Sequence, residues 1–237
     1  MTRLVESPPT TAAAEAAVGG RRWAVPVGFA GLLLVLAGWH FLVDIIACVV
    51  QPLWPTLESH TGLRDGRIFW IFLLWSMTTS FGQLVVGWWA DRFPSRWLLW
   101  AAPPVAAVCL SLLGVSESPW VLAALLFSGA LAIAAFHPEA AATAGGCFPE
   151  HRSRAMSVFA LSGYLGQSVG PFYSGWVTTS GGLEALRGML PWGLAAAVVI
   201  GLAARFVNWP PPSHARRSLS WSGLRGTLPA VAMLVAV

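Results

Sequence analysis

The stretch GWWADRFPSR, residues 87–96, is a short charged break between two long apolar runs. The run before it covers about 68–90 and the run after it about 97–115. Each is close to the roughly 20 apolar residues that cross a bilayer as a helix. Three of the six residues between the runs, 91–96, are charged. Spanning-length apolar segments joined by a short charged break predict a membrane protein built of helices.

The same alternation continues on both sides of this stretch. Four more apolar runs lie along the 237-residue chain, at about 25–50, 120–144, 155–177 and 186–206. Hydrophobic residues make up 56% of the chain and charged residues only 10%, where an ordinary soluble domain carries about 25% charged residues. We therefore expect an all-α membrane protein with a bundle of six spanning helices, and a soluble globule is excluded.

The basic residues indicate how these helices are oriented. All 14 are arginines, and most of them fall on one side of the membrane when the six spans are threaded through it. The arginine-rich side is the cytoplasmic one, so we expect a cytoplasmic N-terminus in a multi-pass cell-membrane protein. A chain without lysine contains no Walker A lysine, so the energy for any transport should come from an ion gradient.

The two ends of the chain differ in composition from its apolar middle. We expect a disordered cytoplasmic tail over 1–22, the six-span bundle over 23–207, a cytoplasmic linker with proline and arginine over 208–227, and the truncated start of a seventh helix over 228–237. Ten helical residues reach about 15 Å, half of a bilayer. This pattern predicts the first half of a longer transporter, and a re-entrant or frayed C-terminal tail is the alternative.

Ionisable residues inside the spans are the first candidates for function. His40 and Asp44 lie in the first span, and His137 and Glu139 lie in the fourth. A charge at mid-bilayer costs roughly 2.5–3.5 kcal/mol on insertion scales, so these groups should face a cavity, find partners or be protonated. Their place in the first span of each triplet predicts a 3+3 inverted repeat, with one pair in the outer and the other in the inner part of the membrane.

Two interpretations of these groups stay open. Residues four apart share one helix face, so Asp44 could orient the imidazole of His40 or share its proton, and the pair would carry protons or meet substrate. Alternatively, the pair only locks the first span to a neighbour. In the fourth span, Pro138 frees a backbone carbonyl, which is tolerated where the backbone lines a cavity. Weaker polar candidates for the same cavity are Gln83, Tyr164 and Gln167.

The loop at 87–96 matches a known pattern. Gly87, Asp91 and Arg92 form a G-x-x-x-D-R sequence that is similar to the cytoplasmic loop of the major facilitator superfamily. Asp91 would pair with an arginine across the bundle and hold an inner gate shut. A plain solvated loop is the alternative interpretation.

The fifth span resembles the same superfamily through its small residues. Gly166, Gly170, Pro171 and Gly175 form a G-x-x-x-G-P-x-x-x-G pattern similar to the superfamily's antiporter motif. Together with Gly163 they are expected to place small residues on one helix face, where a neighbouring helix can approach closely. Close packing without any role in coupling is the other interpretation.

Residues 136–139, Phe-His-Pro-Glu, carry a narrower resemblance. They are similar to the F-H-P-E signature of the fosmidomycin resistance protein family of efflux transporters, and the likeness extends over about 38–175. Leu84 departs from that family's pattern, in which proline often stands at this place. The resemblance implies a twelve-helix, proton-driven exporter of a small molecule or drug, of which this chain supplies the N-terminal half.

The expected partners are a small-molecule substrate, protons, the lipid bilayer, and either a missing C-terminal half or a second copy of the chain. We expect no nucleic-acid partner, no cofactor and no resident metal. No enzyme activity is expected either, because the chain contains no G-x-S-G or H-E-x-x-H motif. The alternatives are a six-span divalent-metal transporter that uses His40 and Asp44, a metabolite-uptake facilitator of the same superfamily, and a haem protein with His40 and His137 as ligands.

Overall fold

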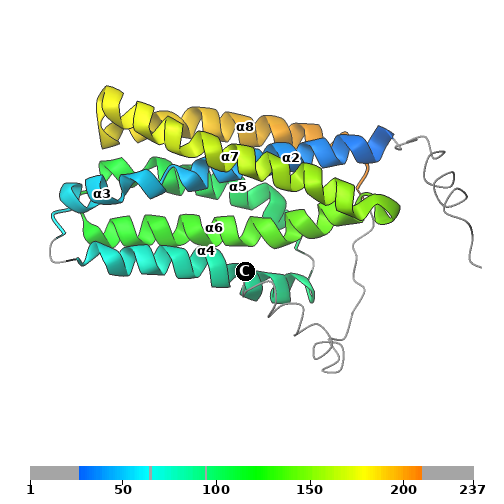
Figure 1. Ribbon diagram of the computed structural model, residues 1–237, viewed down its shortest axis with the longest axis horizontal. Coiled ribbons are helices and arrows are strands. Elements are labelled where there is room, and N and C mark those ends of the chain that lie inside the picture. The colour runs from blue at the N-terminus through cyan, green and yellow to red at the C-terminus, as the bar shows by residue number, and fades with distance from the viewer. Residues whose placement is uncertain (1–26, 64–65, 94, 210–237) are drawn as a thin grey trace, which may run out of the picture.

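The computed structural model describes residues 27–63, 66–93 and 95–209, and within these ranges it contains helices and no strand. Six long helices run alongside one another (Figure 1). They are α2 (Val27–Cys48), α4 (Ile68–Ala90), α5 (Trp97–Ser111), α6 (Pro119–Gly146), α7 (Arg152–Gly181) and α8 (Met189–Ala204). The shorter elements are the helix α3 (Trp54–His60) and the 3₁₀ turns η1 (Gln51–Leu53), η2 (Leu113–Val115), η3 (Pro149–His151) and η4 (Leu183–Gly188). The predicted all-α fold is confirmed.

The predicted spans correspond to these helices, with shifts at their ends. The span predicted over 68–90 begins and ends as α4 does. The first span continues past residue 50, because Pro52 and Pro55 occupy the first turns of two further short helical segments, where a proline needs no amide partner. The sixth span begins with the 3₁₀ turn η4 before α8 takes over.

Five helical segments among the described residues are long and apolar enough to cross a membrane. They are Phe29–His60, Ile68–Ala90, Trp97–Val115, Pro119–Gly146 and Leu183–Ala204. The remaining long helix, α7, is too polar to join this set, because it begins with Arg152 and Arg154 and is rich in serine, threonine and glycine. It packs extensively against α2 all the same, so the six-helix bundle contains one member that is more polar than the others.

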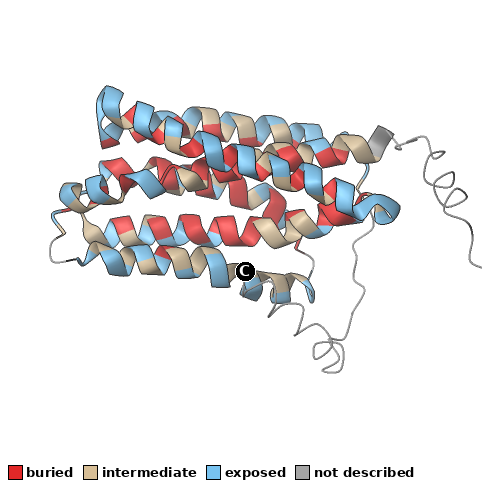
Figure 2. Cartoon of the chain, in the orientation of Figure 1, coloured by how far each residue is buried: buried red, intermediate tan, exposed pale blue. Residues whose placement is uncertain are grey.

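The two triplets of helices pack against each other. The first helix of the first triplet, α2, packs mainly on α7. The first helix of the second triplet, α6, packs mainly on α4 and α5. Each of these two helices therefore packs mainly on helices of the other triplet. The 3+3 inverted repeat stays a prediction. Large buried side chains such as Trp39 and Phe136 fill the interior, and Figure 2 shows α6 with many more buried residues than α4.

The apolar helix α4 lies at the edge of the bundle with most of its surface exposed (Figure 2). Trp75 is its only buried residue, and its exposed side chains include Trp70, Phe81 and Leu84. An apolar helix that is exposed on most of its faces suits contact with lipid chains or with another helical unit.

Glycines bring α7 into close contact with α2. A Cβ atom at Gly166 would lie 2.5 Å from the carbonyl oxygen of Phe41, and one at Gly170 would lie 2.7 Å from that of Ile45. Only glycine permits this approach of the two backbones. Gly175 is exposed and a Cβ there would meet nothing within 4 Å, contrary to the expectation that it shares this face. Five residues turn a helix by about 500°, so Gly175 points well away from Gly170.

Some expectations concern residues outside the described ranges. The tail predicted over 1–22, nearly all of the linker predicted over 208–227, and the seventh helix predicted over 228–237 are among these.

Candidate functional site

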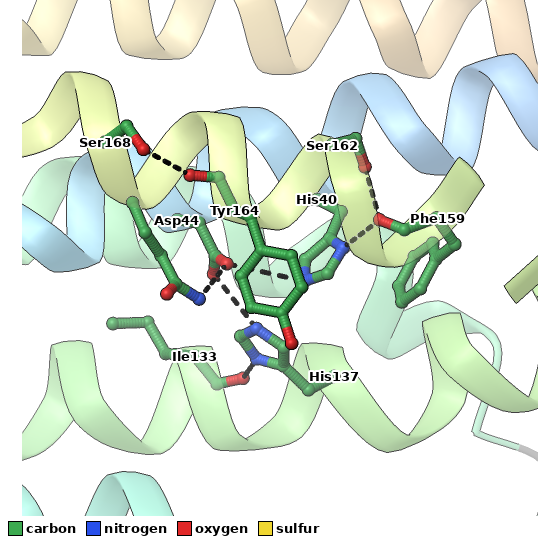
Figure 3. A network of polar contacts seen from close by, with 9 residues as sticks. His40, Asp44, Ile133, His137, Phe159, Ser162, Tyr164 and Ser168 are labelled. Atoms are coloured by element: carbon green, nitrogen blue, oxygen red, sulfur yellow. Dashed lines mark hydrogen bonds and ion pairs between the residues drawn. The ribbon is translucent and has the colours of Figure 1, made fainter. Parts of the chain in front are cut away.

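Asp44 lies inside the first span with only 3% of its surface exposed, and two imidazole rings flank its carboxylate (Figure 3). The Nε2 atom of His137, from α6, lies 3.0 Å from Oδ1. The Nε2 atom of His40, one turn earlier on α2, lies 3.4 Å from Oδ2. We call His40, Asp44 and His137 the intramembrane triad.

Each imidazole of the triad is anchored through its other nitrogen. The Nδ1 atom of His40 donates to the backbone carbonyl of Phe159 at 2.8 Å, and its ring stacks on the Phe159 ring with 4.1 Å between centroids. The Nδ1 atom of His137 donates to the carbonyl of Ile133, one turn earlier on α6, at 2.7 Å. A carbonyl only accepts, so Nδ1 carries a hydrogen in both rings and both Nε2 atoms are directed at Asp44.

These contacts limit where hydrogens can lie between His137 and Asp44. When His137 is neutral with its hydrogen on Nδ1, its Nε2 atom carries a lone pair, and an ionised Asp44 offers only lone pairs as well. Two acceptors at 3.0 Å repel each other unless a proton lies between them. A hydrogen bond at this contact therefore needs one additional hydrogen between the two atoms.

The helix α7 completes the surroundings of Asp44. The side-chain amide of Gln167 donates to Oδ2 at 2.9 Å, so this weaker sequence candidate lies beside the triad. Gly163 lies on the same helix, and a Cβ atom there would be 2.4 Å from Cε1 of His40 and 2.9 Å from Oδ2 of Asp44. The absence of a side chain at Gly163 leaves room for the triad.

The two ionisable pairs were expected at different depths, and this expectation is wrong for His137. Its Nε2 atom bonds to Asp44, and its ring centroid lies 5.2 Å from that of His40. Sequence position gives the place of a residue along its own helix, whereas packing sets the offset between α2 and α6.

Glu139 lies apart from the triad. Two residues turn a helix by about 200°, so Glu139 leaves α6 on nearly the opposite face from His137. Its Oε2 atom accepts a hydrogen bond from the hydroxyl of Ser95, which lies two residues before α5. This contact ties the C-terminal third of α6 to the loop between α4 and α5.

The other two weak polar candidates, Gln83 and Tyr164, do not contact the triad through polar groups. The side-chain amide of Gln83 donates to the carbonyl of Thr79 on its own helix at 2.8 Å. Tyr164 is exposed on α7, directly after Gly163, and its backbone carbonyl accepts a hydrogen bond from Ser168. The structure gives neither side chain a polar contact with the triad.

The loop motif ends α4. Asp91 is the residue at the C-terminus of this helix, is exposed, and forms no ion pair with any residue in the described ranges. The guanidinium of Arg92 lies 3.9 Å from the centroid of the Trp88 ring and donates to the carbonyl of the same residue. Gly87 faces α6, where a Cβ would contact Pro138 at 3.6 Å. Pairing of Asp91 with an arginine across the bundle stays a prediction.

We predict that Asp91→Asn weakens closure of the cytoplasmic side in a transport-competent form of the protein. The substitution removes the charge that would attract an arginine but keeps the size of the side chain. Labelling of single cysteines at the Arg152 end of α7, which we expect to be cytoplasmic, should become faster and transport should fall, with membrane insertion unchanged. If labelling and transport both stay at wild-type levels, Asp91 is a solvated loop residue.

A family model provides the deciding comparison. The model described as Major Facilitator Superfamily matches residues 36–236, which is most of the chain. The chain belongs to the major facilitator superfamily. This is a family of membrane transporters and not of enzymes, and the several apolar helices make the chain a multi-pass membrane protein.

Two curated proteins are similar to the chain over part of their length. The fosmidomycin resistance protein of Escherichia coli (strain K12) is 30% identical over 192 residues, which are 78% of this chain and 45% of that protein. The uncharacterized MFS-type transporter YfnC of Bacillus subtilis (strain 168) is 30% identical over 145 residues, which are 59% of this chain and 34% of that protein. The chain thus spans less than half the length of either relative.

Membership of the superfamily decides between some of the interpretations left open by the sequence. It favours a facilitator over a separate six-span class of divalent-metal transporter. The alternative of a metabolite-uptake facilitator belongs to the same superfamily and stays open.

Several residues of the site escaped the sequence analysis. Phe159 supplies a ring and a backbone carbonyl to His40, and the carbonyl of Ile133 fixes His137. A backbone acceptor leaves no mark in sequence, because every residue type carries one. The sequence places Ser95 beside a spanning helix, but it does not predict the hydrogen bond from Ser95 to Glu139.

Proposed function

We propose that the chain is part of a secondary active transporter that exports a small molecule in exchange for protons. The observation that supports this most directly is the buried contact between Asp44 and His137, where a hydrogen bond needs one additional proton inside the membrane. A buried carboxylate between two imidazoles can hold that proton, and releasing it would leave an uncompensated charge in a setting of low dielectric. Proton binding and release would then favour different arrangements of α2, α6 and α7.

The direction and the substrate class come from the relative's name and the shared F-H-P-E sequence. The fosmidomycin resistance protein of Escherichia coli matches 78% of this chain. We therefore propose drug efflux, with fosmidomycin as the first substrate to test. Glu139 belongs to the same proposal as a second proton-carrying group, placed next to the cytoplasmic loop through Ser95.

We also propose that transport requires a second helical unit. Alternating access needs two bundles that rock about a central site, and this chain supplies one of them. The exposed apolar side chains of α4 and α7, among them Trp70, Phe172 and Trp176, offer a surface for such a unit. The occupant would be a C-terminal half or a second copy of the chain. The excess of arginine on one side supports a cytoplasmic N-terminus in the cell membrane.

Transport by inverted membrane vesicles tests the function. Vesicles from cells that produce the transport-competent protein expose its cytoplasmic face, so an acid lumen should drive accumulation of labelled fosmidomycin inside them. A protonophore should abolish the accumulation, and vesicles without the protein are the control. Accumulation only in right-side-out vesicles would favour the uptake facilitator instead. The chain reconstituted alone should give no gradient-driven flux unless crosslinking shows dimers.

We predict that Glu139→Gln abolishes gradient-driven efflux but spares energy-independent exchange of labelled for unlabelled substrate. Glutamine keeps an acceptor for the Ser95 hydroxyl, so the contact between α6 and the loop survives, but it cannot release a proton. Ser95→Ala is the matched control, since it removes the contact and leaves the carboxyl group. Retained uphill efflux in Glu139→Gln would place Glu139 outside the proton path.

A further inference from the structure

The intramembrane triad also has the chemistry of a metal site. Two imidazoles and one carboxylate are ligands that suit zinc and related divalent ions. The sequence alone offered only the pair on α2, and the third group comes from α6 through the fold. One ligand atom from each of His40, Asp44 and His137 lies within 4.8 Å of the other two.

The spacing of these atoms fits an ion placed among them. Zinc binds imidazole nitrogen at about 2.0–2.1 Å and carboxylate oxygen at about 2.0–2.2 Å. In a tetrahedral site, bonds of this length place ligand atoms roughly 3.4 Å apart. The contacts of 3.0 Å and 3.4 Å between the imidazoles and the carboxylate are close to this spacing. Two ligand atoms at the full separation of 4.8 Å would have to approach each other by roughly 1.4 Å to bind the same ion.

The orientation of the imidazoles is a second, independent indication. Histidines that bind metals almost always donate their other ring N–H to a carbonyl or carboxylate, which fixes the tautomer and directs the lone pair at the ion. Both rings of the triad are held in this way, His40 by the Phe159 carbonyl and His137 by the Ile133 carbonyl. Both Nε2 atoms are therefore presented toward Asp44, ready to bind.

His137 is the most exposed side chain of the triad. The side chain of His137 is 19% exposed, whereas that of Asp44 is 4% exposed. Three protein ligands leave a fourth position open, as in zinc sites that exchange a bound water or ligand. Gln167 donates to Oδ2 of Asp44 beside the triad.

We propose that His40, Asp44 and His137 bind one divalent transition-metal ion of the zinc type per chain. The ion takes the place of the proton between Asp44 and His137, so metal and proton exclude each other at this site. The proposal stands on the geometry of the described chain and does not depend on the direction or substrate of transport.

Binding of Co²⁺ and Zn²⁺ to the purified protein in detergent tests the proposal, with no gradient and no substrate present. The protein is purified with a tag that contains no histidine. We expect one ion per chain and a Co²⁺ absorption spectrum of a four-coordinate nitrogen–oxygen site. His40→Gln, Asp44→Asn and His137→Gln should each weaken metal binding more than about tenfold. Loss of a residue that only hydrogen-bonds a ligand already lowers metal affinity by about tenfold or more, and each of these variants removes a ligand itself. His60→Gln and His151→Gln, at the other described histidines, should leave it unchanged.

The outcomes that overturn the proposal are separate from those of the transport assay. Absence of saturable one-to-one binding overturns it, as does full affinity in both His40→Gln and His137→Gln. X-ray absorption of zinc bound to the wild-type protein decides the matter if a variant does not fold. Two imidazoles and no sulfur in the first coordination shell support the proposal, whereas a sulfur ligand assigns the ion to a cysteine and overturns it. Failure of metal binding leaves the transport proposal intact.

Discussion

Asp44→Asn should abolish gradient-driven transport while the protein still folds and inserts into the membrane. An asparagine at this position can donate its amide hydrogen to the lone pair of Nε2 of His137, and its oxygen can accept from Gln167. The asparagine can therefore form a hydrogen bond in place of each of the two contacts of Asp44, the one to His137 at 3.0 Å and the one to Gln167 at 2.9 Å. The extra proton is no longer needed, so the site loses the element that would respond to a proton gradient.

The measurement is a pair of assays on inverted vesicles or proteoliposomes. Uphill accumulation should fall to the level seen with a protonophore, and exchange of labelled for unlabelled substrate should continue. A variant that loses both activities together would indicate that Asp44 serves assembly rather than coupling, and its helicity and size-exclusion profile would report this. Retained uphill accumulation would remove Asp44 from the proton path.

Gly163→Ala should disrupt the triad through steric conflict alone. The new Cβ atom would lie 2.4 Å from Cε1 and 2.6 Å from Nε2 of His40, closer than any normal contact. His40 cannot simply rotate away, because its ring stacks on Phe159 and its Nδ1 atom bonds to the same residue. Relief requires α7 to move from α2, and overpacking of this kind costs about 1–3 kcal/mol.

Gly175→Ala is the matched control for this substitution. It lies on the same helix and gains the same methyl group, but a Cβ there has nothing within 4 Å. We expect Gly163→Ala to lower the midpoint of thermal unfolding in detergent by a few degrees relative to Gly175→Ala, and to impair transport. Equal midpoints and equal transport in the two variants would show that α7 leaves room for a methyl group between Gly163 and His40.

Much of the fold could be predicted from the sequence because solvation in a bilayer depends on composition along each segment. The apolar runs placed α4 at the observed residues and put α5 and α6 within a few residues of theirs. The more polar α7 was still found, since its polar residues are spread along an apolar pattern. The face of Gly175 was also open to prediction, since helical periodicity alone separates it from Gly170.

The candidate site was predictable only as a set of residues. Charged and polar groups are costly in the membrane, so His40, Asp44, His137 and Glu139 stood out by residue type and place. The contacts that these residues make could not be predicted in the same way. Asp44 joins His137 across 93 positions of sequence, while Glu139, two residues from His137, turns to Ser95 instead.

The sequence by itself determined the membrane class, the helix order, the resemblance to a superfamily and the ionisable residues that deserved scrutiny. These properties follow from hydrophobic length and residue type, which are local. The tertiary structure alone decided that three helices meet at Asp44, that two backbone carbonyls fix the imidazoles, and that Nε2 of His137 faces the carboxylate of Asp44. Those facts depend on the offset and rotation of packed helices, which are set by side-chain contacts distant in sequence.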